Sequence, residues 1–329
     1  MIGAGDVVEH KSGPGFQRAD GSELVAVMRR DAALARDFAA RHQVRHWYAD
    51  ADALIADPEV DAVYVATPPN SHCDYVRRVA RAGKPVYVEK PMARTSAECQ
   101  TMIEACAQAN DGRGVALFVA YYRRAMPRFE TARRLITDGQ LGELRSVSVR
   151  YQRPAPPTSE LHQWRLDPRV SGGGYFVDLA SHTFDWLDHA FGPITTISGD
   201  AAHPLPTSPA VETSAVAAFS FASGVIGAGM WDFAASEAID RIEVVGTRAT
   251  LTLSSFGVEP LALTRAGITT YLDAPYPEVV QLPLIQHIVD VLSGRTDHPI
   301  STGDTALRTA RVIDAVLAGH RERQGVTFG

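Results

Sequence analysis

The chain has 329 residues, of which 45% are hydrophobic and 21% are charged, so it is long enough for two domains with sizeable cores and is neither disordered nor a coiled coil. The net charge of −6 argues against a nucleic-acid-binding or an anionic-membrane-binding surface. The sequence has no apolar run near the ~18 residues of a membrane helix, no signal segment and no CxxC or paired cysteine framework, so we expect a cytoplasmic protein.

The first 120 residues alternate short β-branched runs with helical patterns, which is typical of a parallel α/β unit. The strands are predicted at 24–28, 62–66, 86–88 and 115–119, and the helices at 31–41, at 71–83 and from 95 onward. This order predicts a doubly wound parallel sheet, whose ligand binds at the carboxyl ends of the strands.

From residue 121 onward the pattern predicts an α+β domain with a mostly antiparallel sheet, because several strands are joined by hairpin-like turns. The strands are predicted at 144–151, 195–200, 213–221, 224–231, 241–245 and 250–253, and the helices at 126–137, 174–191, 282–292 and 304–320. We therefore divide the chain into domains 1–120 and 121–329, with the last helix as a candidate to pack back on the first domain.

The start of the chain is unusual for such a sheet. Only Met1 and Ile2 precede Gly3, whereas the first strand of a dinucleotide-binding unit has ~5 residues. Because this strand is central in the sheet, we expect the natural protein to begin several residues upstream. The alternative is a shortened first strand.

A glycine turn follows at once, and it predicts a dinucleotide site. The backbone amides of Gly3, Gly5, Asp6 and Val7 can approach a pyrophosphate at a helix N-terminus. Val8 replaces the third glycine of the fingerprint, and two glycines can also form a plain turn. The strand–helix alternation that follows favours dinucleotide binding.

The end of the second strand indicates which dinucleotide binds. A carboxylate at this position would accept hydrogen bonds from the ribose hydroxyls of NAD, but the sequence has Arg29 and Arg30. Two guanidiniums suit a 2′-phosphate, so we predict that NADP(H) is preferred and that NAD(H) remains possible. The alternative is that both arginines are ordinary solvated residues at the start of a helix.

Glu89, Lys90 and Pro91 directly follow the strand at 86–88, where functional groups of an α/β sheet gather. A lysine there can hydrogen-bond a substrate hydroxyl and stabilise a developing alkoxide. A surface ion pair between Glu89 and Lys90 is the structural alternative.

Asp178, His182 and Asp185 fall on one stripe of an otherwise apolar helix that follows a run of three glycines. Such a stripe is costly in a core, so it either faces a cleft or forms a satisfied packing network. A third metal ligand is not evident nearby, and we predict no metal.

Two pairs add an aromatic face and a guanidinium that suit a sugar or a phosphate. These pairs are Tyr122 with Arg123 and Trp164 with Arg165. Either pair, taken alone, is also compatible with surface packing.

Together these residues resemble the glucose–fructose oxidoreductase / inositol dehydrogenase (Gfo/Idh/MocA) family across nearly the whole chain. The combination of Glu-Lys-Pro, a downstream glycine run and Asp-x-x-x-His is specific. The matching segments are the glycine turn, 66–72, 82–91, 122–124, 164–165, 172–174, 178–182 and 301–304.

The resemblance implies a Rossmann domain, an α+β domain with a large open-faced antiparallel sheet, and hydride transfer between a nicotinamide and a carbinol or carbonyl carbon of a sugar, polyol or cyclic diol. It implies that Lys90, Asp178 and His182 line the substrate site and carry the chemistry, with Tyr122 and Arg123 as further substrate contacts. It places the following residues at the cofactor: Thr67, Pro68, Asn70, His72, Glu89, Lys90, Trp164 and Arg165.

Two other functions stay open at this point. One is an NAD-dependent glycosidase on the same fold, and the other is a nonenzymatic cofactor-binding regulator, which would be expected to lose the catalytic groups. We also expect a homodimer or homotetramer built on the sheet of the second domain, because apolar residues alternate at 216–221 and 225–231.

Overall fold

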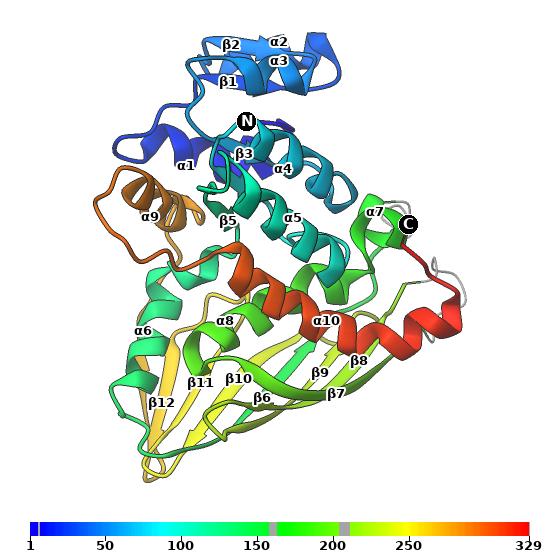
Figure 1. Ribbon diagram of the computed structural model, residues 1–329. Coiled ribbons are helices and arrows are strands. Elements are labelled where there is room, and N and C mark those ends of the chain that lie inside the picture. The colour runs from blue at the N-terminus through cyan, green and yellow to red at the C-terminus, as the bar shows by residue number, and fades with distance from the viewer. Residues whose placement is uncertain (6, 158–162, 204–210, 329) are drawn as a thin grey trace. The chain divides into compact units, whose positions relative to one another are not determined.

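The computed structural model describes residues 1–5, 7–157, 163–203 and 211–328, and the chain divides into two compact units (Figure 1). The first unit comprises Met1–Met126 and Pro277–Leu307, and the second comprises Pro127–Tyr276 and Arg308–Gly329. The chain therefore passes between the units three times, and a single boundary near residue 120 is an approximation.

The first unit contains the predicted doubly wound parallel sheet. Strand β1 pairs with β2, and β3, β4 and β5 pair in that order, all in parallel. Ile2 bridges Met28 and Val65 in parallel and so joins the two groups of strands. The strands are β1 (Ala26–Met28), β2 (His46–Tyr48), β3 (Val63–Val65), β4 (Val86–Val88) and β5 (Leu117–Val119).

Helices flank this sheet, and polar caps fix where they begin. Asp31 accepts hydrogen bonds from the amides of Ala33 and Leu34 and begins α2, and Thr95 caps α5. The helices of this unit are α1 (Gly13–Arg18), α2 (Ala32–Arg41), α3 (Ala51–Ala56), α4 (His72–Arg81), α5 (Ser96–Gln108) and α9 (Leu282–Leu292). Shorter π and 3-10 turns lie at Val8–Ser12, Pro69–Ser71 and Tyr122–Arg124.

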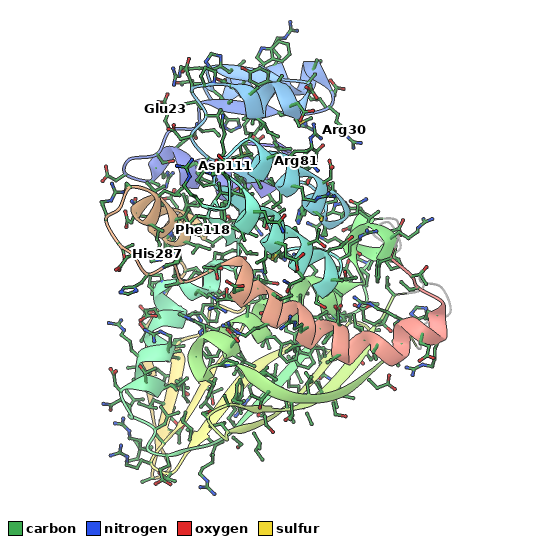
Figure 2. All side chains as sticks on the ribbon, in the orientation of Figure 1. Glu23, Arg30, Arg81, Asp111, Phe118 and His287 are labelled. Carbon is green, nitrogen blue, oxygen red and sulfur yellow. The ribbon has the colours of Figure 1, made fainter. Side chains whose placement is uncertain are left out.

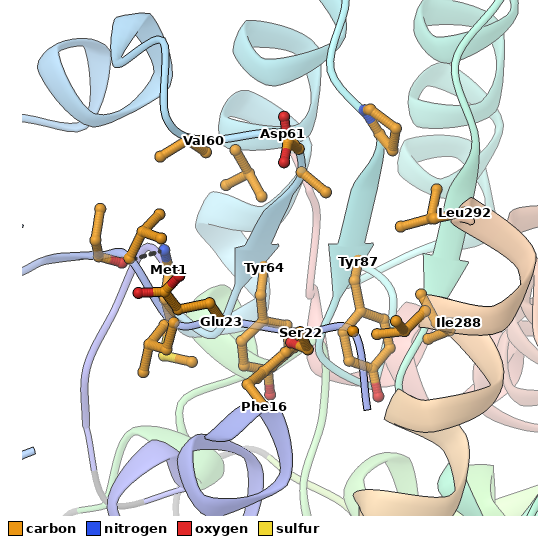
Figure 3. A pocket seen from close by; sticks show the side chains of 18 of the residues that line it. Met1, Phe16, Ser22, Glu23, Val60, Asp61, Tyr64, Tyr87, Ile288 and Leu292 are labelled. Carbon is orange, nitrogen blue, oxygen red and sulfur yellow. Dashed lines mark hydrogen bonds between the residues drawn. The ribbon is translucent and has the colours of Figure 1, made fainter. Parts of the chain in front are cut away.

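A cavity lies between the starts of β1 and β3 (Figure 3). Met1 donates its ammonium hydrogen bond to Ala26 O at 2.8 Å, and burial lowers the pKa of this ammonium to about 5. Beyond Met1 the cavity has a volume of about 910 Å³ and is lined partly by Tyr64 and Tyr87, whose rings stack at 4.9 Å. The described residues therefore leave a cavity where these two strands begin.

The second unit contains the large, mostly antiparallel sheet that we predicted. Among the described residues the strand order is β13-β12-β11-β10-β6-β9-β8-β7, and only the β6–β9 pair is parallel. The strands are β6 (Leu144–Gln152), β7 (Ile194–Ala202), β8 (Ser214–Phe221), β9 (Ile226–Asp232), β10 (Ile239–Gly246), β11 (Thr250–Leu253), β12 (Leu261–Arg265) and β13 (Ile268–Leu272).

Aromatic packing holds the central helix of this unit against one face of the sheet. Phe184 of α8 contacts Phe219 of β8 and Trp231 of β9, with ring centroids 5.7 Å and 5.1 Å apart. Gly227 and Gly229 of β9 make room for these rings, since a Cβ at either position would lie within 2.4 Å of ring atoms. The helices of this unit are α6 (Pro127–Thr137), α7 (Pro168–Ser171), α8 (Ser181–Phe191) and most of α10 (Gly303–Gln324).

Among the elements that were not predicted from the sequence are two pairs of neighbours. Strand β2 and helix α3 are short, and the central residue of β2, Trp47, is exposed. Strands β12 and β13 form a hairpin whose turn residues, Ala266 and Gly267, both have positive φ. Alanine rarely adopts this conformation, so the usual hairpin signal is missing.

None of the helices in the described part of the chain is long and apolar enough to cross a membrane.

Candidate active site

The glycine turn lies at the carboxyl end of the first parallel sheet and opens into a cavity. Gly3 has a φ of +93°, and a Cβ there would lie 2.9 Å from Ala66 O, so only glycine fits. A Cβ at Gly5 would meet no atom within 4 Å, so the space beside Gly5 is open to a ligand. Asp6 lies outside the described residues.

A wide turn follows the glycines and begins at Val8, the residue in the third position of the fingerprint. Val8–Ser12 is a π-helical turn, and Val8 is buried with Val7 as the preceding cap. Gly13 ends this turn, and a Cβ there would lie 2.5 Å from Val8 O.

Several of the predicted cofactor residues meet around one cavity of about 340 Å³ in the first unit. Arg30 is exposed at its rim and extends outward in Figure 2. Within the described part of the chain, neither Arg29 nor Arg30 makes an ion pair, whereas the Asp31 carboxylate already caps α2. The cavity is lined by Gly3, Ala4, Gly5, Met28, Arg29, Arg30, Asp31, Ala66, Thr67, Pro68 and Tyr75.

His72 ties two loops of the first unit together. Its Nδ1 lies 3.1 Å from Pro91 O and 3.0 Å from Met92 O, and its Nε2 lies 2.6 Å from Thr67 O. Burial lowers the pKa of His72, and the hydrogen bonds to these carbonyls oppose this effect. His72 is fully buried, so its side chain fixes the loops and does not line the cavity. Asn70 is exposed and also lies off the cavity.

The Glu89 carboxylate is buried beneath the backbone of Lys90. It accepts hydrogen bonds from the Lys90 amide at 3.1 Å, from the Gln281 side chain at 2.8 Å and from the Tyr64 hydroxyl. Burial, followed by the charge of Glu89, raises the pKa of Tyr64 well above its usual value, so the hydroxyl keeps its proton. Glu89 therefore supports the lysine and is not a surface ion-pair partner. Gln281 is 192 positions away in the sequence, and no local pattern points to it.

Tyr122 and Arg123 lie in a 3-10 turn after β5. Burial raises the pKa of Tyr122, but the charges of Arg123, Lys90 and Lys11 outweigh this effect and hold its pKa below the usual value. Lys90 and Tyr122 are thus close enough within the first unit to interact through their charges. Arg124 is committed to the fold, since it donates to Ile300 O at 3.1 Å.

In the second unit, Trp164, Arg165 and Asp178 form a chain of contacts. The Arg165 guanidinium lies 4.5 Å from the centre of the Trp164 ring, and its Nε lies 3.5 Å from Asp178 Oδ2. Both side chains of this ion pair are partly exposed. The structure therefore brings these three predicted residues together.

Asp178 and His182 straddle a change of helix type. Asp178 lies in a π-helical turn at Phe176–Ala180, and His182 lies in the first turn of α8. Single π turns are frequent at functional sites, because they break the regular helical register. His182 is buried, with its ring edge-on to Phe256 at 6.1 Å.

Asp185, the third residue of the predicted stripe, is fully buried and accepts a hydrogen bond of 3.5 Å from Thr309. Asp188, which the sequence analysis did not single out, accepts two hydrogen bonds of 2.7 Å from Arg308. The stripe thus has a candidate catalytic end at Asp178 and His182 and a packing end toward α10. Among the described residues, no group of His, Cys, Asp and Glu side chains is placed to hold a metal ion.

Glu212 was not predicted from the sequence, and it supports the helix that carries Asp178 and His182. It is buried, and its Oε1 accepts hydrogen bonds from the amides of Gly174 at 2.7 Å and Val177 at 3.3 Å. Burial raises the pKa of Glu212, although these amides oppose the effect. A Cβ at Gly173 would lie 3.1 Å from Glu212 Oε2, so the glycine run lets the carboxylate approach.

We predict that Glu212→Ala weakens the second unit, because two buried N–H groups lose their acceptor at about 1–3 kcal/mol each. Glu212→Gln keeps a carbonyl acceptor and should retain most of the stability. Thermal unfolding of both variants checks this, and equal melting temperatures for Glu212→Ala and the wild type would show that the carboxylate does not support the helix.

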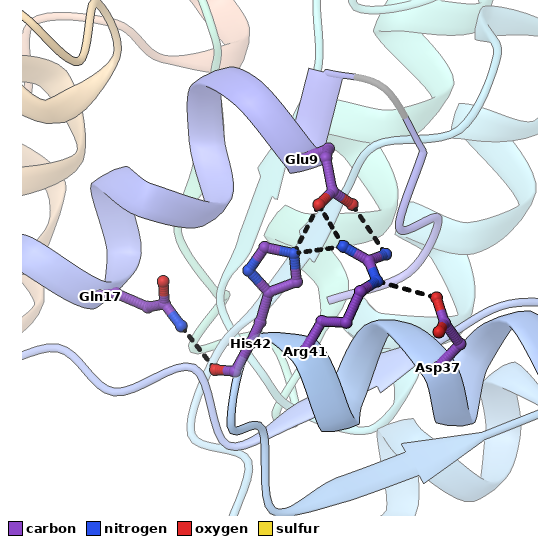
Figure 4. A network of polar contacts seen from close by, with 5 residues as sticks. All are labelled: Glu9, Gln17, Asp37, Arg41 and His42. Atoms are coloured by element: carbon purple, nitrogen blue, oxygen red, sulfur yellow. Dashed lines mark hydrogen bonds and ion pairs between the residues drawn. The ribbon is translucent and has the colours of Figure 1, made fainter.

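An ion-pair network joins the helix after the glycine turn to α2 (Figure 4). Glu9 lies 2.7 Å from His42 Nε2 and 3.1 Å from Arg41 Nη2, Arg41 also pairs with Asp37 at 2.9 Å, and Gln17 donates to His42 O. The hydrogen bond from Arg41 lowers the pKa of Glu9 to about 2, with burial opposing it and His42 adding to it.

This lowered pKa gives a pH dependence with a defined sign. Glu9 should stabilise the fold fully above its unfolded pKa of about 4.5, and the contribution should disappear as pH falls toward 2. The Arg41 side chain is about half exposed, so the effect is modest. We expect Glu9→Gln to lower the melting temperature at pH 7 and to lower it much less at pH 2.5, and an equal loss at both values would contradict this assignment.

Comparisons with known proteins match both parts of the chain to one family of oxidoreductases. Residues 1–117 match the description "Oxidoreductase family, NAD-binding Rossmann fold", and residues 129–252 match "GFO/IDH/MocA C-terminal domain". "Oxidoreductase P35" of Formosa agariphila is 34% identical over 94% of this chain and 95% of its own length.

Two further proteins are similar. "1,5-anhydro-D-fructose reductase" of Ensifer adhaerens is 29% identical over 72% of this chain and 70% of its own length. The solved structure of a levoglucosan dehydrogenase in complex with NADH and levoglucosan has the same fold, with a TM-score of 0.83 and 20% identity over 98% of this chain and 96% of that chain.

Proposed function

Because this chain belongs to the GFO/IDH/MocA oxidoreductase family, with an NAD-binding Rossmann domain, we propose that it transfers a hydride between a nicotinamide and a carbinol or carbonyl carbon of a sugar, a polyol or a cyclic diol. The observation that carries the proposal is the placement of Lys90 directly after β4, on a backbone held by the buried Glu89. The names of the relatives, an anhydrofructose reductase and a levoglucosan dehydrogenase, support this class of substrate.

The residues of the first unit fit the cofactor. Gly5 leaves open space beside the turn, where backbone amides would hold the pyrophosphate. The two arginines at the rim of the cavity would hold a 2′-phosphate. When the cofactor is bound, its nicotinamide supplies or accepts the hydride. Trp164 and Arg165 are proposed to close over the cofactor, as the resemblance implies.

The remaining chemistry is proton transfer, since removal of a hydride from a carbinol carbon also requires loss of the hydroxyl proton. We assign this exchange to His182, because an imidazole titrates near neutrality. The Lys90 ammonium stabilises the alkoxide that develops on the oxygen. Asp178 binds a neighbouring hydroxyl or orients the imidazole, and Tyr122 and Arg123 contribute further substrate contacts.

We predict that Lys90→Ala and His182→Ala each lower kcat by roughly 10²–10⁴, while cofactor affinity and melting temperature stay nearly unchanged. The assay follows nicotinamide absorbance across levoglucosan, inositols, aldoses, ketosugars and dihydrodiols. His287→Ala is the control, because it removes an imidazole whose hydrogen bond within the described residues goes to the His298 carbonyl. A variant that keeps the wild-type kcat removes its residue from the mechanism.

We also propose a preference for NADP(H). Arg29 and Arg30 are available for a phosphate, whereas Asp31 is committed to capping α2. A charge-assisted phosphate contact changes affinity by roughly ten- to a hundredfold. Fluorescence titration should therefore give a lower Kd for NADPH than for NADH, and replacing both arginines by alanine should remove the difference. Equal Kd values in the wild type would refute the preference.

The outer face of the sheet in the second unit supports a homodimer or homotetramer. Val216 of β8 and Met230 of β9 are paired in register, and each is 47% exposed. Ile226 is 59% exposed on the same face, and exposed apolar patches of this kind are commonly buried in oligomers.

Light scattering at micromolar concentration should give the mass of a dimer or tetramer for the wild type and a monomer for Met230→Asp. A monomeric wild type would contradict the proposed assembly. We also propose that the enzyme acts in the cytoplasm.

A further inference from the structure

We propose that Phe256 and Tyr151 make the enzyme selective for cyclic substrates, by packing against the C–H face of the substrate ring beside His182. This inference rests on the proposed function and concerns only residues of the second unit. Neither aromatic residue belongs to a motif in the sequence.

The two rings belong to an aromatic cluster that reaches His182. The Phe256 ring lies 6.1 Å from the His182 ring at an interplanar angle of 78°, and the Tyr151 ring lies 5.1 Å from the Phe256 ring. Phe233 and Tyr175 extend the cluster and are buried, whereas Phe256 and Tyr151 are only half-buried. The cluster therefore presents aromatic surface next to the proposed proton-transfer residue.

Asp240 fixes the loop that carries Phe256. Its carboxylate accepts hydrogen bonds from three consecutive amides, those of Ser255 at 2.8 Å, Phe256 at 2.6 Å and Gly257 at 3.0 Å. Asp240 is the register partner of Tyr151 between β10 and β6. The positions of both aromatic rings are thus set by the same pair of strands, β6 and β10.

Further contacts join this loop to the helix of His182. The Ser255 hydroxyl lies 3.1 Å from the hydroxyl of Thr183, the residue after His182. The Ser254 hydroxyl accepts a hydrogen bond of 3.0 Å from the fully buried Arg128. Because the loop is attached to both the sheet and the helix, the distance between Phe256 and His182 is held, as selective binding requires.

The chemistry of a ring substrate suits this surface. A cyclic polyol or a pyranose has C–H groups on the faces of its ring and hydroxyl groups around its edge. Aromatic rings bury the apolar face, and the partly exposed Asp178 and Arg165 side chains are suited to the hydroxyls. An acyclic polyol has no rigid C–H face and loses more conformational freedom on binding.

The experiment measures KM and kcat for Phe256→Ala and Phe256→Leu, using the ring substrate that the wild type oxidises fastest and sorbitol as the acyclic probe. Tyr271→Ala is the matched control, because it removes an aromatic ring from the same sheet at a residue that is 70% exposed on β13. NADPH affinity and melting temperature are measured for every variant.

We expect Phe256→Ala to raise KM for the ring substrate about tenfold or more, with kcat and NADPH affinity changed less than about threefold. Phe256→Leu should be intermediate, Asp240→Asn should change KM in the same direction, and Tyr271→Ala should match the wild type. The ratio of kcat/KM between the ring substrate and sorbitol should fall in Phe256→Ala.

Two results would overturn the inference, and they are distinguishable. If Phe256→Ala lowers only the melting temperature and keeps the wild-type KM and ring preference, Phe256 is a packing residue and the proposed function stands. If the wild type oxidises or reduces no member of the substrate panel, the proposed function fails and the inference fails with it.

Discussion

Glu89 and Glu212 are buried carboxylates, one in each unit, that accept hydrogen bonds from the backbone beside the proposed catalytic groups. A buried carboxylate is costly unless hydrogen bonds satisfy it. Each of these two carboxylates is satisfied only when the neighbouring backbone keeps one conformation. The positions of Lys90 and of the helix that carries His182 therefore depend on the hydrogen bonds that these two carboxyl groups accept.

Polar side chains also hold the loops on the cofactor side and on the substrate side of the site. His72 holds the loops after β3 and β4 through three carbonyl groups, and Asp240 holds the loop of Phe256 through three amides. Loops that bind ligands are otherwise among the least stable parts of a fold. Buried polar side chains thus provide the rigidity that positions each functional group.

Much of this fold could be predicted from the sequence, because the parallel strands are continuous apolar runs and the helices begin at residues such as Asp31 and Thr95 that cap them. The sequence also places Gly3, Arg29 and Thr67 at the ends of strands, and the structure brings them around one cavity. The assigned roles of Lys90, Asp178 and His182 stay proposals. Elements with weak local signals were missed, such as the β12–β13 hairpin with Ala266 in its turn.

The supporting residues could not be predicted, because their partners are far away in the sequence. Gln281 reaches Glu89 and Glu212 reaches Gly174 only once the chain has folded. The π-helical turn that begins at Val8 is another feature that composition does not reveal. Motifs identify where chemistry is expected, whereas the side chains that hold a motif in place obey no fixed spacing.

The central claim is that the enzyme moves a hydride from a substrate carbon to a nicotinamide. The most direct test uses the panel substrate that the wild type oxidises fastest, deuterated at every carbon, with NADP⁺ and detection of the reduced cofactor by NMR. The account predicts stoichiometric transfer of one deuterium to C4 of the nicotinamide ring. Substrate conversion with no deuterium gained by the released cofactor would contradict it.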